Sequence, residues 1–99
     1  MVRHVMVFKF KDTEEKTAME HAKDLKTVLE ALVGVIPGLI SMQVGLDETG
    51  SERAYTCSIF SGFESFDALA AFKVHPGHIK AIEPLRKASV AGGGVDYTV

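Results

Sequence analysis

The segment from Arg3 to Phe10 carries apolar side chains on both of its faces, which constrains the fold more than any other feature. Valine, phenylalanine and methionine dominate it and no turn-forming residue interrupts it, so we predict a β-strand. Because side chains alternate across a strand, one face presents His4, Met6, Phe8 and Phe10. The other face presents Val5, Val7, Lys9 and Lys11. Because both faces carry apolar groups, both need cover. A chain of 99 residues buries about 60–70% of the surface that its unfolded form exposes, which suffices for one core.

A helix is predicted to follow this strand. Residues 12–15, Asp-Thr-Glu-Glu, fit a capping box with Asp12 as the N-cap and Glu15 at N3. Apolar residues then recur mostly at steps of three or four: Ala18, Ala22, Leu25, Leu29, Leu32 and Val33. Gly34 stands where a glycine commonly ends a helix, so we expect the helix to run up to it.

Two further strands are predicted in the middle of the chain. Pro37 and Gly38 fit positions i+1 and i+2 of a type II turn. Residues Leu39 to Leu46 then alternate between apolar and small or polar side chains, as in a half-buried strand. The polar residues 47–53 indicate a loop, and Ala54 to Ser61 form the next predicted strand. So short a loop favours an antiparallel hairpin.

A second helical region is predicted next. Ser65 can cap a helix from Phe66 to Val74, and Pro76 disfavours helical backbone at His75. A further helical piece should start at Pro76 or at the glycine after it and run toward residue 88, with Pro84 interrupting or kinking it.

The end of the chain contains three consecutive glycines. We expect Ala91–Gly94 to be a flexible connector and Val95–Val99 to be the last strand. The predicted order is therefore strand, helix, strand, strand, helix, strand. This is the ferredoxin-like βαββαβ arrangement of the α+β class, a four-stranded antiparallel sheet with helices on one face, formed by one domain over residues 1–99. The face with Val5 and Val7 stays open, so we expect two sheets to pair as a dimeric α+β barrel.

Composition and motifs limit the classes of function. The net charge of −2 gives no electrostatic case for nucleic acid or an anionic membrane, and no apolar run approaches the roughly 20 residues of a membrane span. The chain enters a strand directly after Met1, so we expect no signal peptide and a cytoplasmic location. One cysteine excludes an internal disulfide. There is no phosphate-binding loop, nucleophile elbow or dinucleotide fingerprint, and we expect no cofactor.

Several short segments, which together span essentially the whole chain, carry a family resemblance: residues 3–10, Ile36-Pro37-Gly38, Gly45, Phe63-Glu64-Ser65, His75-Pro76-Gly77-His78 and Asp96-Tyr97. Together they resemble the stress-responsive A/B barrel domain family, a branch of the dimeric α+β barrel superfamily. The resemblance implies a homodimer whose sheets form a central barrel with the helices outside. It also implies a link to stress responses, but it does not imply one activity.

His4 and His78 are the leading catalytic candidates. They match two histidines that border the substrate pocket in a polyketide cyclase of the family. An imidazole with a pKa near neutrality can remove an acidic proton between two carbonyls. The alternative, which we weigh above catalysis, is that His4 is a hydrogen-bonded core residue and His78 a polar residue at a helix start.

Two departures weaken the cyclase hypothesis. The cyclase has a tyrosine where this chain has Phe72, and a histidine where this chain has Cys57, two residues after Tyr55. We therefore expect a pocket for a small apolar or aromatic molecule, lined by Met6, Phe8, Tyr55, Cys57, Phe72 and His75. Cys57 is expected to be a buried, inert thiol.

The sequence raises two metal hypotheses. His75 and His78 are three residues apart, but no Cys or Asp nearby completes a zinc site, and His75 can equally end one helix before Pro76 starts the next. The family resemblance implies a second site, where backbone carbonyls of Val33, Ile36 and Leu39 hold a hard cation. Water or an adventitious ion at the same carbonyls is the alternative.

Three hypotheses for function follow. The first is a small homodimeric protein that binds a small apolar molecule between sheet and helices without catalysis. The second is a cyclase-like enzyme on a small polyketide or aromatic substrate, with His4 and His78 as acid and base. The third is a cofactor-free monooxygenase, as occurs elsewhere in the superfamily.

Overall fold

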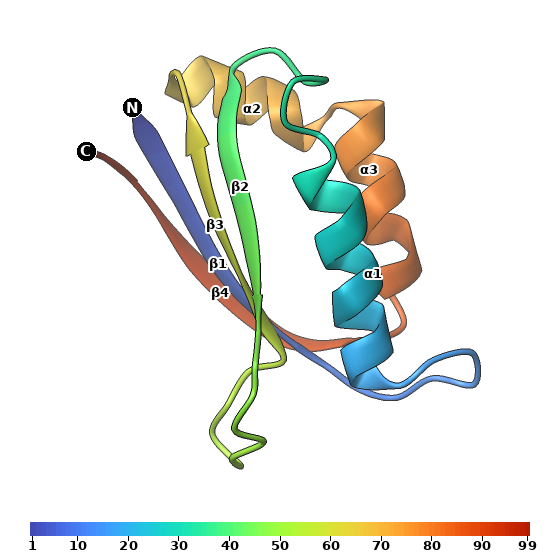
Figure 1. Cartoon of the computed structure of the whole chain (residues 1–99). Coiled ribbons are helices and arrows are strands. Elements are labelled where there is room, and N and C mark those ends of the chain that lie inside the picture. The colour runs from blue at the N-terminus through green and yellow to red at the C-terminus, as the bar shows by residue number, and fades with distance from the viewer.

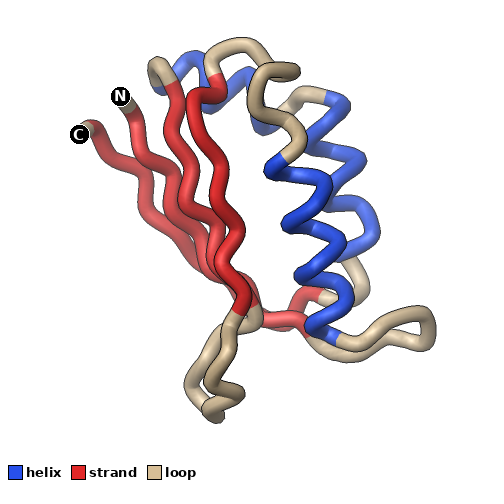
Figure 2. The backbone as a smooth tube through the Cα atoms, in the orientation of Figure 1, coloured by secondary structure: helices blue, strands red, loops and turns tan.

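The computed structural model describes residues 1–99 as one antiparallel sheet covered on one face by helices (Figures 1 and 2). The elements in chain order are β1 (Val2–Phe10), α1 (Ala18–Glu30), β2 (Leu39–Leu46), β3 (Cys57–Phe63), α2 (Phe66–Lys73), α3 (Pro76–Ile82), the 3₁₀ turn η1 (Glu83–Leu85) and β4 (Ser89–Thr98). The strands lie in the order β2-β3-β1-β4, and every neighbouring pair is antiparallel. The predicted ferredoxin-like α+β fold is confirmed.

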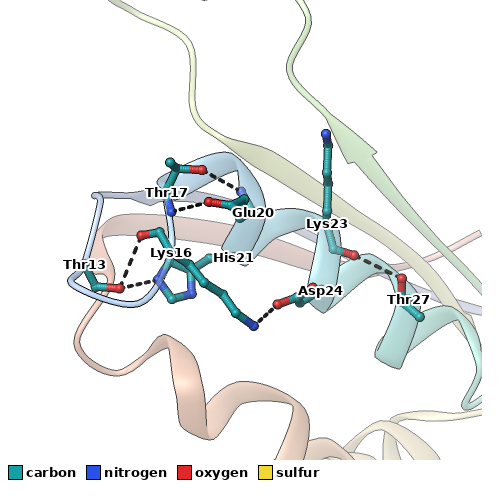
Figure 3. Close-up of polar contacts among 8 residues, drawn as sticks. All are labelled: Thr13, Lys16, Thr17, Glu20, His21, Lys23, Asp24 and Thr27. Carbon is teal, nitrogen blue, oxygen red and sulfur yellow. Dashed lines mark hydrogen bonds and ion pairs between the residues drawn. The ribbon is translucent and has the colours of Figure 1, made fainter.

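The N-cap of helix α1 lies five residues after the predicted one. Thr17 is the N-cap: its hydroxyl accepts a hydrogen bond from the Glu20 amide at 3.1 Å, and its own amide donates to the Glu20 carboxylate at 2.9 Å (Figure 3). Asp12 instead accepts from the amide of Ala18. The prediction of Asp12 as N-cap was wrong because residues 13–16 are all polar, and a helix over them has no apolar side to bury.

The end of α1 also differs from the prediction. The helix stops at Glu30, and residues 31–35 form turns in which the amides of Val35 and Ile36 both donate to the carbonyl of Leu32. Gly34 lies within these turns with φ +86°, a conformation that favours glycine. The following type II turn is confirmed by the hydrogen bond from the Leu39 amide to the Ile36 carbonyl and by the positive φ of Gly38, +84°, at position i+2.

The core lies between α1 and the sheet. Leu25 and Leu29 of α1 are buried against the sheet, where Val44 of β2 and Phe63 of β3 are almost fully inaccessible. A further contact joins α1 to the edge strand β2. Lys26 donates to the Val44 carbonyl at 2.8 Å, and the Val44 amide donates to the Glu30 carboxylate at 3.0 Å. Both backbone groups of this β2 residue are thus bonded by a helix.

The glycine-rich stretch is part of β4, so the predicted flexible connector was wrong. Gly92 lies opposite Phe8 in the sheet, and Gly94 lies opposite Met6. A Cβ atom on Gly94 would overlap the Met6 sulfur, and one on Gly92 would lie 3.1 Å from the Phe8 ring. Glycine is needed here because large side chains of β1 lean over the backbone of β4, not because the segment is a linker.

The remaining elements differ from the predictions only in their boundaries. The third strand begins at Cys57 instead of Ala54 and continues past Ser61 to Phe63. Ser65 caps α2 as predicted, and the predicted interruption at Pro84 is confirmed, because α3 gives way there to η1. No helix is long and apolar enough to span a membrane.

The second face of the sheet carries no helix, and we call it the outer sheet face. It presents Val5, Val7, Phe60, Val95 and Tyr97, the side chains that alternate with the helix-facing ones. Phe60, Val95 and Tyr97 are 42%, 56% and 41% exposed, which is high for large apolar residues. Arg3 lies over the Phe60 ring at 4.3 Å. The open apolar face expected from Val5 and Val7 is present.

Candidate functional site

A cavity of about 610 Å³ lies between the sheet and the helices, and we call it the central cavity. Met6, Phe8 and Phe10 of β1 form its floor, and helices α1 and α3 form the opposite wall. Its lining is mainly apolar and includes Leu25, Leu29, Met42, Ile59, Phe72, Ile82, Leu85 and Gly94. The remaining lining residues are polar or charged: His4, Lys73, His78, Arg86, Ser89 and Asp96.

Four of these residues form a polar cluster at one end of the central cavity: His4, Lys73, His78 and Asp96. The register of the sheet places His4 of β1 directly opposite Asp96 of β4. The Nδ1 atom of His4 bonds a carboxylate oxygen of Asp96, and Lys73 Nζ lies 4.0 Å from the other oxygen. A carboxylate only accepts hydrogen bonds, so His4 carries a proton on Nδ1, which leaves Nε2 as the ring nitrogen without a contact to Asp96.

His78 is positioned by a backbone carbonyl. Its Nδ1 atom donates to the carbonyl of Lys73 at 3.1 Å, so the neutral ring keeps a lone pair on Nε2. Burial lowers the pKa of His78, while the hydrogen bond to Lys73 opposes this shift; positive charge on His4 and on the Lys73 side chain adds to the lowering. The Phe72 ring packs at 4.6 Å from the His78 ring. His78 is therefore a neutral acceptor at pH 7.

The structure brings together some of the residues expected at the pocket and separates others. His4, His78, Met6, Phe8 and Phe72 all line the central cavity. Tyr55 and Cys57 do not line it; they border a shallower hollow at the end of the β2–β3 hairpin. His75 also lies outside, because its Nδ1 accepts from the Gly77 amide and caps α3.

Sequence reasoning missed several lining residues. From the sequence, Asp96 is named only as part of the family resemblance. No role is assigned to Lys73, Arg86 or Ser89. Asp96 could have been noticed as the one acidic residue of the last strand, but its pairing with His4 depends on the register of β4.

Cys57 is 3% exposed, and burial raises the pKa of its thiol to about 11. A thiol with so high a pKa carries almost no thiolate at neutral pH, and the thiolate is the nucleophilic form. The environment of Cys57 is that of an inert core residue.

Some residues of each metal hypothesis already make other contacts. No group of three or more His, Cys, Asp or Glu side chains is arranged to hold a metal ion. His75 and His78 each use Nδ1 in a hydrogen bond to the backbone. Among the three carbonyls of the implied cation site, at Val33, Ile36 and Leu39, that of Ile36 accepts the amide of Leu39 at 3.3 Å.

The comparison with known families agrees with the fold. The model of the Stress responsive A/B Barrel Domain matches residues 2–99. The chain belongs to this family. Among curated proteins, olivetolic acid cyclase from Cannabis sativa is 34% identical over 80 residues, which cover 79% of this chain and 76% of that protein.

Solved structures show the same A/B barrel domain fold. A dimeric protein with a ferredoxin-like fold from Bacteroides fragilis superposes with a TM-score of 0.86 at 25% identity, covering 99% of this chain and 95% of that one. Hydroxynitrile lyase from Passiflora edulis superposes with a TM-score of 0.77 at 18% identity, covering 99% and 92%. The family fold therefore occurs in proteins named for different reactions.

Proposed function

We propose that this A/B barrel domain is a homodimeric protein that binds a small apolar or aromatic molecule in the central cavity. The cavity itself carries this proposal. Its volume of about 610 Å³ lies within the roughly 300–1,000 Å³ typical of ligand pockets. An apolar lining supplies affinity through burial, and the few polar groups that interrupt it fix the orientation of the ligand.

The outer sheet face supports the homodimer. Val5, Phe60 and Val95 lie side by side across three strands and together present apolar surface to solvent. Burying such surface stabilises association, and a second copy of the same sheet offers a matching surface. The related Bacteroides fragilis protein is described as dimeric.

Binding is tested with 8-phenyloctan-1-ol, a neutral probe with a ring and an apolar chain, by isothermal titration calorimetry. Replacing Ile82, which lines the cavity, with Trp should fill it and weaken binding at least about tenfold. Val28→Trp is the matched control, because Val28 is exposed on α1 outside the cavity. Circular dichroism checks that both variants fold. If the wild type binds no probe, or folded Ile82→Trp binds as well as the wild type, the proposed pocket is wrong.

The polar cluster favours a second candidate, an acid–base enzyme acting on a carbonyl compound. His78 offers a lone pair on Nε2, and His4 is backed by the Asp96 carboxylate at the same end of the cavity. A neutral His78 can accept a proton from a carbon between two carbonyls, and His4, whose Nδ1 is held by Asp96, would donate to the enolate oxygen that forms if Nε2 carries a second proton. Phe72 has no hydroxyl to assist, so the substrate and outcome need not match those of the cyclase.

The other expectations remain predictions. No lining residue specifically favours a cofactor-free monooxygenase. A role in stress responses and a cytoplasmic location rest on the family resemblance and on the sequence alone.

A further inference from the structure

The central cavity has polar groups at both ends. Asp96 pairs with His4 near the start of β1, whereas Ser89 pairs with Phe10 at its end. His4 and Phe10 are six residues apart, which is about 20 Å at roughly 3.3 Å per strand residue. Met6 and Phe8 lie between them and are apolar. The cavity is therefore elongated, with the polar cluster at one end and Ser89 at the other.

Arg86 lines the cavity together with Ser89 and follows η1. Its Nε atom donates to the Glu83 carboxylate at 2.8 Å, and this is the one side-chain hydrogen bond that it makes. A guanidinium presents two edges to acceptors, so the contact with Glu83 uses one edge and leaves the two terminal nitrogens available. Glu83 itself does not line the cavity.

We propose that Arg86 and Ser89 form a carboxylate-binding subsite, and that the ligand is an elongated molecule with an apolar or aromatic body and a terminal carboxylate. The inference rests on the proposed function, since it names the class of ligand for the same cavity. A carboxylate accepts two parallel hydrogen bonds from the free edge of Arg86, with the Ser89 hydroxyl as a further donor. The apolar body then covers Met6 and Phe8.

The polar cluster is the poorer place for this carboxylate. Unlike Glu83 beside Arg86, Asp96 of the polar cluster lines the cavity itself. Its carboxylate already bonds His4 and lies 4.0 Å from Lys73 Nζ. A second carboxylate would be repelled by Asp96 at close range. The ligand therefore places its carboxylate at Arg86 and its other end, which carries no negative charge, beside His4 and His78.

The test compares 8-phenyloctanoate with 8-phenyloctan-1-ol, two probes that differ in the end group, by calorimetry on the intact protein. Arg86→Met keeps an apolar stem of similar length but removes the guanidinium. It should weaken 8-phenyloctanoate binding about tenfold or more, while the affinity for the alcohol changes less than about twofold. Lys80→Met is the matched control, since it removes one positive charge from α3 outside the cavity. It should leave both affinities unchanged.

The outcomes separate this inference from the proposed function. If the wild type binds the alcohol but Arg86→Met leaves 8-phenyloctanoate binding intact, the carboxylate subsite is wrong and the pocket stands. The subsite is also wrong if Lys80→Met weakens the carboxylate equally, or if Lys73→Met weakens it in place of Arg86→Met. If neither probe binds the wild type, the pocket itself is wrong.

Discussion

At the scale of single residues, the two histidines of the polar cluster differ in what holds them. His4 bonds a carboxylate, whereas His78 bonds a backbone carbonyl, is half-buried and has Lys73 as a cationic neighbour. The lowered pKa of His78 means that the unfolded chain takes up a proton before the folded one does. Its contribution to stability is therefore complete above the ordinary histidine value of 6.5 and is lost as pH falls toward the lower folded pKa.

If the acid–base hypothesis is correct, His78→Gln should slow proton exchange at the carbon between the carbonyls of ethyl 2-methylacetoacetate by about 10²-fold or more. The reason is the loss of the Nε2 lone pair that accepts the proton. Exchange is followed by NMR in D₂O with the protein as catalyst. Wild-type exchange should persist somewhat below pH 6.5, because His78 stays neutral there.

His75→Asn is the control for this experiment. It removes a histidine that lies outside the cavity, and asparagine can replace it as the cap of α3. Equal exchange rates in His78→Gln and the wild type would exclude His78 as the base.

The candidate site was only partly predictable. His4 and His78 were found because their positions match a family pattern. Asp96 and Ser89 could not be assigned partners, since their contacts depend on the register of a strand whose glycines indicated a linker. Arg86 follows a kink at Pro84, and a sequence pattern does not specify which way a side chain points after such a kink.

At the scale of elements, Lys26 and Glu30 of α1 fasten the helix to the outermost strand β2 through Val44. Lys26 first, and then the Val44 amide, hold the pKa of Glu30 below its ordinary value of 4.5. A carboxyl group with a lowered folded pKa stabilises the protein above its ordinary pKa and stops doing so as pH falls through the folded value.

Glu30→Ala should lower the free energy of unfolding by about 1 kcal/mol at pH 7, because the Val44 amide and Lys26 lose their partner. The loss is at the lower end of what a hydrogen bond to a charged group contributes, because the Glu30 side chain is 34% exposed. Guanidinium unfolding monitored by circular dichroism measures the change. Glu14→Ala, at an exposed site before α1, should change the value by less than about 0.5 kcal/mol.

The difference between Glu30→Ala and the wild type should shrink below pH 4.5, as the carboxyl group takes up a proton. A difference that is constant between pH 7 and pH 3 would mean that Glu30 acts through packing and not through its charge.

Element order was predictable, and boundaries were not. Hydrophobic periodicity identified β1, α1 and β2, because each buries one stripe or face, whereas only the second half of β4 was predicted as a strand. The start of α1 was placed at the wrong one of two similar caps, Asp12 or Thr17, since both are followed by glutamate three residues later. Only the position of the first buried residue separates them.

At the scale of the whole molecule, the outer sheet face is where the proposed dimer forms. We expect the wild type to have twice the 10.7 kDa mass of the chain by light scattering. Val5→Asp, or separately Val7→Asp, should yield monomers and lower the thermal stability, because the interface would bury a charge without a partner.

Val28→Asp is the control, since Val28 is the same apolar residue as Val5 and Val7 but is exposed on α1, away from this face. If both sheet variants keep the wild-type mass, the dimer does not form through the outer sheet face. A wild type that stays monomeric in dilute solution would contradict the homodimer itself.

The contact of Glu30 and Lys26 with Val44 has a consequence for how molecules could join side by side. The opposite margin of the sheet, β4, is exposed along its whole length and has free main-chain groups to offer. A neighbour could add its own β4 there, but at the other margin both backbone groups of Val44 are already bonded by α1. Lateral joining of this kind ends with two molecules, because an endless fibril requires two open margins on each.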